Sequence, residues 1–475
     1  MRRSMVETKL ETLRLKNRGE GIDNSKMHVS VIGAGLAGSE AAIQLAKRGI
    51  DVKLYEMRPN KTTGAHITSD CAEFVCSNSL GSADITNASG LLKKEMEIYG
   101  GELIEIAKEH SVPAGNALAI AREDFSKAVN ERIANFPNIE LIREEITEIP
   151  DGNVIIATGP LTSDEFANSI KKFTKTEHLH FFDAIAPIVE VDSINFDKAF
   201  WGSRYDKGEA SYINCPMNKK EYENFYNILI NSPRIENHDV DKKEFFESCL
   251  PVEVLASRGV DTLRFGPMKP VGLIDKRTGV ENYAVVQLRQ DNSAKTLFNL
   301  VGFQTNLKWG AQKELVHSIP GLENANIVRY GVMHRNTFIN SSVILNPTFE
   351  TIDRKGLFFA GQITGTEGYT ESIAGGLLAG INMSRRLSGQ EPIIFPKETM
   401  LGALSNYITD KAHLAHISKR NGELRYLPPQ PINSNWAIVA PIKFPPGFPK
   451  KNKKLKTELL AKRAIETAET FWRQL

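Results

Sequence analysis

The sequence predicts an α/β protein in which a Rossmann-like domain is interrupted by an inserted α+β domain. From Met27 the pattern is strand, glycine turn, helix and strand, as in a βαβ unit. Between residues 190 and 325, short alternating segments such as "YAVVQLRQ" predict an antiparallel sheet with a few helices. The first domain then returns: "GLFFAGQITGTEGYTESIAGGLLAGINMSRRL" predicts a strand, a glycine-rich turn and a helix.

These patterns divide the chain into five segments. They are an N-terminal extension (1–26), the first part of the Rossmann-like domain (27–189), the inserted domain (190–325), the second part of the Rossmann-like domain (326–390) and a helical, basic C-terminal segment (391–475). The extension is polar and lacks the apolar stretch of a secretory signal, so we expect it to be disordered. The sequence does not decide whether translation starts at Met1 or at Met27.

The composition excludes several classes of protein. A chain of 475 residues, 41% of them hydrophobic, is long enough for two or three domains with full cores. Its net charge of +2 does not indicate a nucleic-acid binder, so any RNA contact must come from local patches. The clearest basic patch consists of Lys450, Lys451, Lys453, Lys454 and Lys456. The alternative interpretation of these lysines is an ordinary solvated surface. No apolar run is long enough to span a membrane, and four cysteines are too few for a disulfide scaffold in a chain of this length. We therefore predict a cytoplasmic protein. We expect neither a DNA partner nor a metal site.

A dinucleotide site is predicted where the first strand ends. The turn consists of Gly33, Ala34, Gly35, Leu36, Ala37 and Gly38. In this fingerprint Gly33 allows the tight turn, Gly35 lets the backbone approach a pyrophosphate, and Gly38 lets helix and strand pack closely. Glu56 ends the next strand 18 residues after Gly38, where a carboxylate accepts hydrogen bonds from a ribose hydroxyl.

Two later turns favour FAD over NAD. "VIIATGP", which contains Thr158 and Gly159, is typical of glutathione-reductase-like flavoproteins. "GLFFAGQITG", which contains Gly361 and Gln362, is similar to their second FAD strand, although Gln362 replaces the usual Asp. We therefore expect a glutathione-reductase-like FAD-binding domain.

Cys71 and Cys76 are five residues apart, a spacing that fits either a redox disulfide or one working thiol beside a bystander. Disulfide reductases carry a Gly-Gly-Thr-Cys start, a second glycine fingerprint and a C-terminal His-Glu pair, and this sequence has none of them. The pattern therefore favours a working thiol.

Many segments together carry a family resemblance. They are "VIGAGLAGSEAAIQLAKRGIDVKLYEMRP", "CAEFVCSNSL", "SVPAGNALAI", "SRYDKGEASYINCPM", "FFESCLPVEV", "FGPMKPVGL", "VVQLRQD", "NLVGFQTNLKWGAQK", "VRYGVMHRNTFIN" and "FFAGQITGTEGYTESIAGGLLAGIN". From Met27 to Asn382 the chain resembles TrmFO, the folate- and FAD-dependent tRNA (uracil-5-)-methyltransferase family. The wobble-uridine carboxymethylaminomethyl family shares the flavin motifs, but we do not expect "FGPMKPVGL" in it.

The resemblance implies formation of 5-methyluridine at the T-loop uridine, position 54, of tRNA. It implies FAD, methylenetetrahydrofolate as the carbon source and NADH or NADPH as the reductant. The alternatives are the same chemistry on a 23S ribosomal RNA uridine, a small-molecule FAD oxidoreductase, and a flavin-stabilised RNA-binding protein without activity. The oligomeric state is not predicted.

The resemblance also assigns residues. Cys249 matches the thiol that attacks uracil C6, and Cys76 matches the general base beside the flavin. His334 and Arg335 are candidates for the folate, and Tyr369 for contact with the cofactors. Cys71 is expected to have no role in the chemistry, and Cys215 is expected to be a buried structural residue. Lys269 and Arg289 could each contact phosphate, contact folate or form an ion pair at the surface.

Overall fold

The computed structural model describes residues 28–176, 179–184, 186–206, 209–235, 250–279, 282–331, 333–411, 417–420, 423–426, 431–444, 448–449 and 452–475. The expected N-terminal extension, Cys249, and Lys450 and Lys451 lie outside the described residues.

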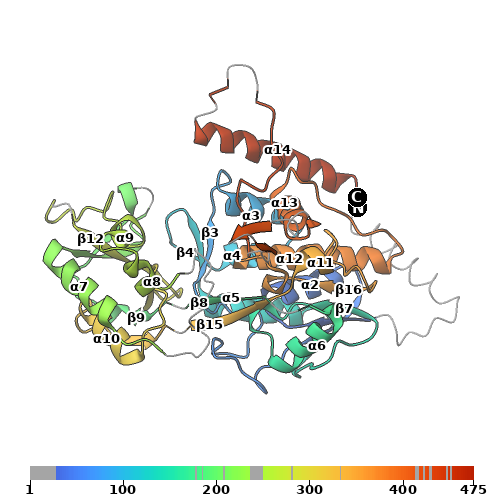
Figure 1. Cartoon of the computed structure of the whole chain (residues 1–475), viewed down its shortest axis with the longest axis horizontal. Coiled ribbons are helices and arrows are strands. Elements are labelled where there is room, and N and C mark those ends of the chain that lie inside the picture. The colour runs from blue at the N-terminus through green and yellow to red at the C-terminus, as the bar shows by residue number, and fades with distance from the viewer. Residues whose placement is uncertain are drawn as a thin grey trace.

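The large domain is built on a parallel sheet with the strand order β16-β7-β1-β2-β6. Its strands are β1 (His28–Ile32), β2 (Asp51–Tyr55), β6 (Ile139–Ile142), β7 (Asn153–Ile156) and β16 (Leu357–Phe359). A small sheet, β3 (Ser79–Ser82), β5 (Ala117–Ile120) and β4 (Ser111–Val112), lies at the side of the large domain that faces the inserted domain (Figure 1). The strand that returns after the insertion, β16, therefore completes the first sheet.

Helices pack around this sheet. They are α2 (Leu36–Ala46), α3 (Ala88–Ile98), α4 (Glu102–Glu109), α5 (Arg122–Ala134), α6 (Asp164–Thr174), α11 (Ser341–Ile344), α12 (Tyr369–Leu387), α13 (Met400–Ile408) and α14 (Lys453–Arg473). Helix α2 is buried along its whole length and lies directly against α12. A Cβ on Gly376 of α12 would lie 2.2 Å from the carbonyl oxygen of Ala37, so glycine is what allows these two helices to approach so closely.

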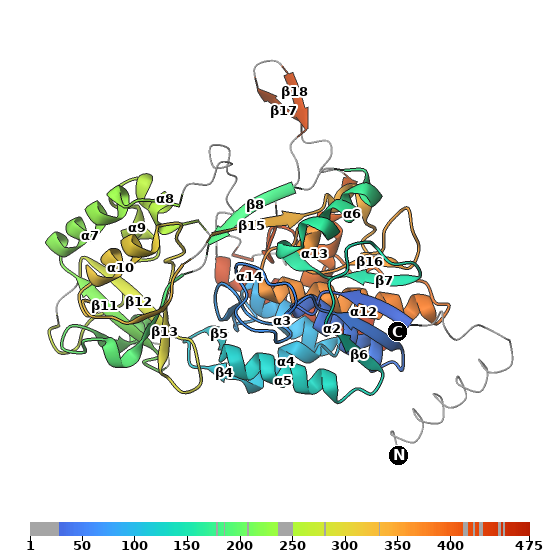
Figure 2. The same cartoon turned by 90° about the horizontal axis from the view of Figure 1, so that it is seen from below.

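A two-stranded ribbon leads to the inserted domain and back. In it β8 (Leu179–Ala184) pairs antiparallel with β15 (Met333–Phe338), and Figure 2 shows the ribbon reaching from the large domain toward the inserted one. A second small hairpin, β17 (Ile417–Arg420) with β18 (Glu423–Tyr426), lies near the C-terminus of the chain.

The inserted domain has its own sheet and core. The strand order is β10-β11-β12-β13-β9-β14, with β9 (Ile188–Glu190), β10 (Phe200–Gly202), β11 (Tyr212–Met217), β12 (Ala284–Gln290), β13 (Leu297–Leu300) and β14 (Ile327–Arg329). Neighbouring strands of this sheet pair antiparallel throughout the described residues. Helices α7 (Lys219–Asn231), α8 (Val252–Ser257), α9 (Thr262–Phe265) and α10 (Trp309–His317) pack with it around a separate hydrophobic core. The expected fold class, a Rossmann-like domain with an inserted α+β domain, is confirmed.

Among the described residues, no helix is both long and apolar enough to cross a membrane.

Candidate active site

A cavity opens at the carboxyl ends of the parallel strands, where nucleotides bind in doubly wound folds. It holds about 980 Å³ of empty space, part of which is open to solvent. The predicted cofactor residues that line it are Gly33, Gly35, Leu36, Ala37, Glu56, Thr158, Gly159, Gly361, Gln362 and Tyr369. The other two, Ala34 and Gly38, are buried behind this wall. Segments that are far apart in the sequence thus line one cavity.

Two of the glycines are required by packing within the first turn. Gly33 has a φ of +96°, and a Cβ there would lie 2.7 Å from the carbonyl oxygen of Ala157. A Cβ on Gly38 would lie 1.8 Å from the carbonyl oxygen of Gly33. Larger residues at these positions would push the strand and the helix apart.

Gly35 is different, because nothing in the protein requires a glycine there. Its φ of −70° suits any residue, and a Cβ would meet no atom within 4 Å. Gly35 precedes α2 without a side-chain cap, so the first-turn amides of that helix face the cavity wall. The free space and these amides form a cradle for a phosphate, and the residues present therefore fit a dinucleotide.

Glu56 is fixed beside the turn by two donors. Its Oε2 accepts from the amide of Ala34 at 3.1 Å, and its Oε1 accepts from Arg58 Nε at 2.8 Å. Burial alone would raise the pKa of Glu56, but the hydrogen bonds and the charge of Arg58 outweigh it and lower the pKa. The carboxylate therefore remains ionised and able to accept from a ribose hydroxyl.

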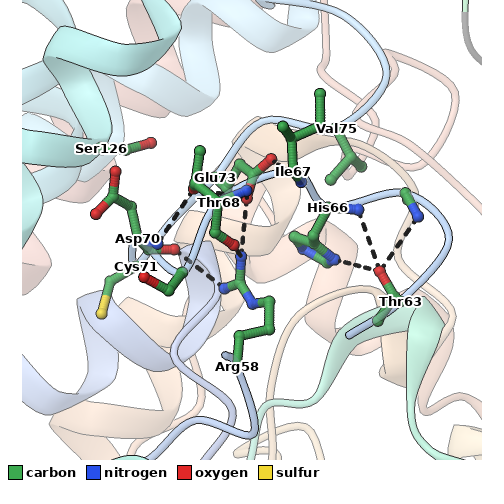
Figure 3. Close-up of polar contacts among 12 residues, drawn as sticks. Arg58, Thr63, His66, Ile67, Thr68, Asp70, Cys71, Glu73, Val75 and Ser126 are labelled. Atoms are coloured by element: carbon green, nitrogen blue, oxygen red, sulfur yellow. Dashed lines mark hydrogen bonds and ion pairs between the residues drawn. The ribbon is translucent and has the colours of Figure 1, made fainter. Parts of the chain in front are cut away.

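Arg58 is a site residue that the sequence did not reveal. It is only 2% exposed, and its guanidinium also donates to Glu73 at 2.9 Å and to the carbonyl oxygens of Thr68 and Asp70 (Figure 3). It thereby holds the segment from Thr68 to Glu73 against the cavity. Its place two residues after Glu56, at the end of the same strand, is the signal that could have indicated it.

Thr63 and His66 also line the cavity, and the sequence did not indicate them either. His66 Nδ1 lies 2.6 Å from Thr63 Oγ1, and Figure 3 shows the two side chains facing each other.

Cys76 is held by Tyr369, the first residue of α12. The phenolic oxygen of Tyr369 accepts from the amides of Val75 at 3.0 Å and Cys76 at 2.7 Å, and it lies 2.9 Å from Cys76 Sγ. Burial and the neighbouring Cys76 raise the pKa of Tyr369, so its hydroxyl keeps its proton. Because two amides already occupy the phenolic oxygen, this proton is available to the sulfur.

Arg122, at the start of α5, supports the same loop from the other side. It donates to the carbonyl oxygens of Phe74 at 3.0 Å and Cys76 at 3.5 Å, and its Nε pairs with Asp291 at 3.0 Å. Asp291 follows β12, so this ion pair joins the cysteine loop to the inserted domain. The loop is thereby fixed between the two domains.

Cys71 and Cys76 have different environments. Both are free thiols, but Cys71 is fully buried, and burial raises its pKa to about 12. Its sulfur points away from Arg58 in Figure 3. Cys215 is likewise free and fully buried on β11, and burial raises its pKa as well. Of these three thiols, only Cys76 is partly exposed.

The second glycine turn and the Ala-Thr-Gly turn complete the cavity wall. A Cβ on Gly361, where φ is +79°, would lie 2.8 Å from the Cβ of Ala37, so the two nucleotide turns meet there. Gln362 donates to Glu367 at 3.0 Å, which fixes its side chain. Thr158 Oγ1 lies 2.6 Å from Thr162 Oγ1.

The remaining candidates are only partly placed. His334 and Arg335 lie on β15, opposite Asp183 and Phe182 of β8, and their side chains are outside the described part of the structure. Strand β15 itself lies against the short helices η2 (Gly159–Leu161) and η7 (Gln362–Thr364) of the cavity wall.

Of the alternatives expected for Arg289, which were contact with phosphate, contact with folate and pairing at the surface, the structure does not show the last. Arg289 is only 9% exposed, because β12 lies inside its sheet. Its Nε donates to Asn78 Oδ1 at 2.9 Å, and Asn78 also accepts from Asn299 at 3.1 Å. Arg289 thus belongs to a buried polar network between the two domains. Lys269, by contrast, is exposed.

Comparisons with known proteins agree with this geometry. Residues 28–391 match the family model "Glucose inhibited division protein A". "Methylenetetrahydrofolate--tRNA-(uracil-5-)-methyltransferase TrmFO" of Ligilactobacillus salivarius is 54% identical over 93% of this chain and 98% of its own length. The enzyme of that name from Anoxybacillus flavithermus is 54% identical over 94% of this chain and 100% of its own length.

A solved structure supports the fold. GidA of Aquifex aeolicus superposes with a TM-score of 0.64 at 16% identity, covering 95% of this chain and 75% of that chain. Because the sequence relatives are so similar and match over nearly their full length, the chain belongs to the TrmFO family.

Proposed function

We propose that this chain forms 5-methyluridine at the T-loop uridine, position 54, of tRNA. In this proposal methylenetetrahydrofolate is the carbon source, FAD is the bound cofactor, and NADH or NADPH is the reductant. The names of the relatives support the reaction. The observation that carries the proposal is the Cys76 thiol, held by Tyr369, a residue that lines the dinucleotide cavity. We also propose that the protein acts in the cytoplasm, where tRNA is modified.

The cavity suits FAD in three respects. The cradle at Gly35 would hold the pyrophosphate, Glu56 would accept from the adenosine ribose, and the second turn at Gly361 would face the rest of the cofactor. When bound and reduced, the flavin supplies the hydride that converts a methylene group to a methyl group.

The chain's own residues must handle thiol and proton chemistry. Uracil C5 becomes nucleophilic when a thiolate adds to C6, and the C5 proton must later be removed by a base. In this proposal Cys76 accepts this proton, and the Tyr369 hydroxyl, 2.9 Å from its sulfur, holds the sulfur in place by a hydrogen bond. Arg122 and the backbone contacts keep the sulfur at one place during proton transfer.

Two assignments remain predictions from the resemblance. Cys249, the proposed C6 nucleophile, lies outside the described residues. His334 and Arg335 are proposed to contact the folate, and the position of β15 against the cavity wall supports this.

The test is transfer of label from methylenetetrahydrofolate to RNA. The FAD-loaded protein is incubated with the labelled folate, NADPH and either undermodified tRNA or 23S ribosomal RNA, followed by nucleoside analysis. We expect labelled 5-methyluridine in the tRNA alone. Label only in the ribosomal RNA would move the substrate to the alternative RNA, and flavin turnover without labelled RNA would contradict the proposal.

A further inference from the structure

An open groove that the flavin chemistry does not use runs from the domain boundary across the inserted domain. Its first part lies between Gly81 and Ala117 of the small sheet and Tyr212 and Gln287 of the inserted sheet. Its second part follows β10, the edge strand of the inserted sheet. The two parts hold about 1020 and 1460 Å³ of empty space, including open solvent, and they share Ser203 and Tyr205.

The groove begins five residues along the chain from Cys76. Gly81 follows Cys76 by five residues, so their Cα atoms lie at most about 17 Å apart along the chain. The loop between them is held by Asn78, which donates to the carbonyl oxygens of Ile120 at 2.9 Å and of Gln290 at 2.7 Å. A chain-like ligand lying in the groove would therefore have one end within about 17 Å of the Cα atom of Cys76.

Tyr205 stands where the two parts of the groove meet, in a strained backbone conformation. Its φ of 60° and ψ of 27° are left-handed values that a bulky residue rarely adopts. The strain is maintained by its amide, which donates to the carbonyl oxygen of Gly272 at 2.7 Å. Strain of this kind persists where the surroundings impose it and often marks a functional position.

The ring of Tyr205 packs on the backbone of the inserted domain, and the residue is still largely exposed. A Cβ on Gly272 would lie 2.7 Å from two of its ring atoms, so the ring packs directly on that glycine. The residue nevertheless remains 58% exposed. An exposed aromatic ring on a backbone that is held in place is a surface on which a nucleotide base stacks.

Other aromatic residues and cations border the same groove. Trp201 is 44% exposed and stacks on Phe196 with ring centroids 6.0 Å apart. The Arg204 guanidinium donates to the carbonyl oxygens of Val271 and Lys269, and no carboxylate among the described residues forms an ion pair with it. These donations also bring the exposed Lys269 beside the groove. Phosphates of a polynucleotide would complement this positive charge.

We propose that this groove binds unpaired nucleotides of the RNA substrate, with a base stacked on Tyr205 and with Arg204 and Lys269 near the phosphates. The proposal rests on the function proposed above and adds the place where the RNA lies. A uridine that reacts must leave its stacked loop, so neighbouring nucleotides need a surface that holds them unstacked. The groove supplies such a surface beside the Cys76 loop.

The test measures RNA affinity with the full-length, FAD-loaded protein. An unmodified tRNA transcript is titrated by fluorescence anisotropy at two salt concentrations. We expect Tyr205→Ala to weaken binding about tenfold, because one base loses its stacking partner. Tyr205→Trp should restore most of the affinity. Trp309→Ala, which removes an exposed aromatic ring on α10 outside the groove, is the matched control and should bind as the wild type does.

A second variant distinguishes loss of the aromatic ring from misfolding of the protein. Tyr205→Gly removes the ring and also suits the left-handed backbone, so it should fold, keep its FAD and lose affinity as Tyr205→Ala does. Arg204→Ala should reduce the dependence of affinity on salt. RNA that carries 4-thiouridine in its T-loop should crosslink to the peptide that contains Tyr205.

The outcomes separate this proposal from the function itself. If the wild type transfers label from folate to tRNA while Tyr205→Ala and Tyr205→Gly bind the transcript as tightly as it does, the groove proposal is overturned and the function stands. An equal loss in Trp309→Ala would also overturn it. If the wild type transfers no label to any RNA, the proposed function fails, whatever the affinities are.

Discussion

The nucleotide cavity and the groove of the inserted domain are built in opposite ways. The cavity is formed by backbone: strand ends, glycine turns and the helix start at Leu36, with the buried Glu56 beside them. The groove is an open surface that includes exposed rings and charged side chains of both signs, and its central residue Tyr205 has a left-handed backbone held by a hydrogen bond to Gly272. A rigid cavity suits a cofactor that stays bound, whereas an open surface suits a large substrate that must enter and leave.

The largest effect on the cavity is expected from Gly35→Glu. A Cβ there would meet no atom within 4 Å, so the fold should survive, while the phosphate cradle is filled by a negative charge. We predict that the purified variant lacks FAD, as measured by its absorbance near 450 nm, with little change in thermal stability.

Gly310→Glu is the matched control, because Gly310 also faces open space but lies on α10 of the inserted domain. It should retain its flavin. Full FAD occupancy in Gly35→Glu would refute the assignment of the cradle.

The next largest effect concerns the two thiols of the segment that follows the second strand, Cys71 and Cys76. In a Cys249→Ala background at pH 8.5, we expect iodoacetamide to modify Cys76 roughly 100-fold faster than Cys71. Burial raises the pKa of Cys71 to about 12, so that thiol stays protonated throughout the range from pH 7 to 9 and is also inaccessible. Peptide mass spectrometry over time measures both rates, and comparable rates would contradict the distinction between them.

Tyr369→Phe should give an intermediate effect. The change removes the acceptor of two amides and the hydroxyl beside Cys76, while the ring keeps its packing on Phe74. We predict a loss of about tenfold in methylation and about 1–3 kcal/mol of stability, with FAD still bound. Turnover and thermal melting are measured beside Tyr330→Phe, a control in the inserted domain. Wild-type turnover in Tyr369→Phe would remove this tyrosine from the mechanism.

The smallest effect is expected from deletion of residues 1–26. The first core strand begins at His28, so flavin content, RNA affinity and methylation should stay near those of the full chain. A large fall in melting temperature on deletion would show instead that this segment packs on the cavity domain or on the groove.

The sequence indicated the cavity better than its supporting contacts, for a physical reason. A glycine turn between a strand and a helix has a fixed spacing along the chain, so Gly33, Gly35 and Glu56 could be assigned locally. The contact between Cys76 and Tyr369 joins residues 293 positions apart, and only folding brings them together. Arg122 was missed for the same reason.

The structure of the inserted domain was harder to predict from the sequence than that of the nucleotide cavity. Its antiparallel sheet was predicted from alternation, but Arg289 turned out to be buried in a polar network rather than paired at the surface. Tyr205 and Gly272 form the centre of the groove although they are distant in the sequence, and a left-handed tyrosine leaves no pattern in the residues around it. The role of Cys249 remains a prediction.

The division of work between Cys249 and Cys76 is tested most directly by trapping with RNA that carries 5-fluorouridine at the target position. Fluorine at C5 cannot leave as a proton does, so the adduct between the attacking thiol and C6 persists and is visible as a protein–RNA complex on a denaturing gel. We predict that Cys249→Ala traps no RNA, that Cys76→Ala traps RNA but does not methylate, and that Cys71→Ala does both. Normal trapping by Cys249→Ala together with no trapping by Cys76→Ala would place the attacking thiol at the cavity and contradict this division.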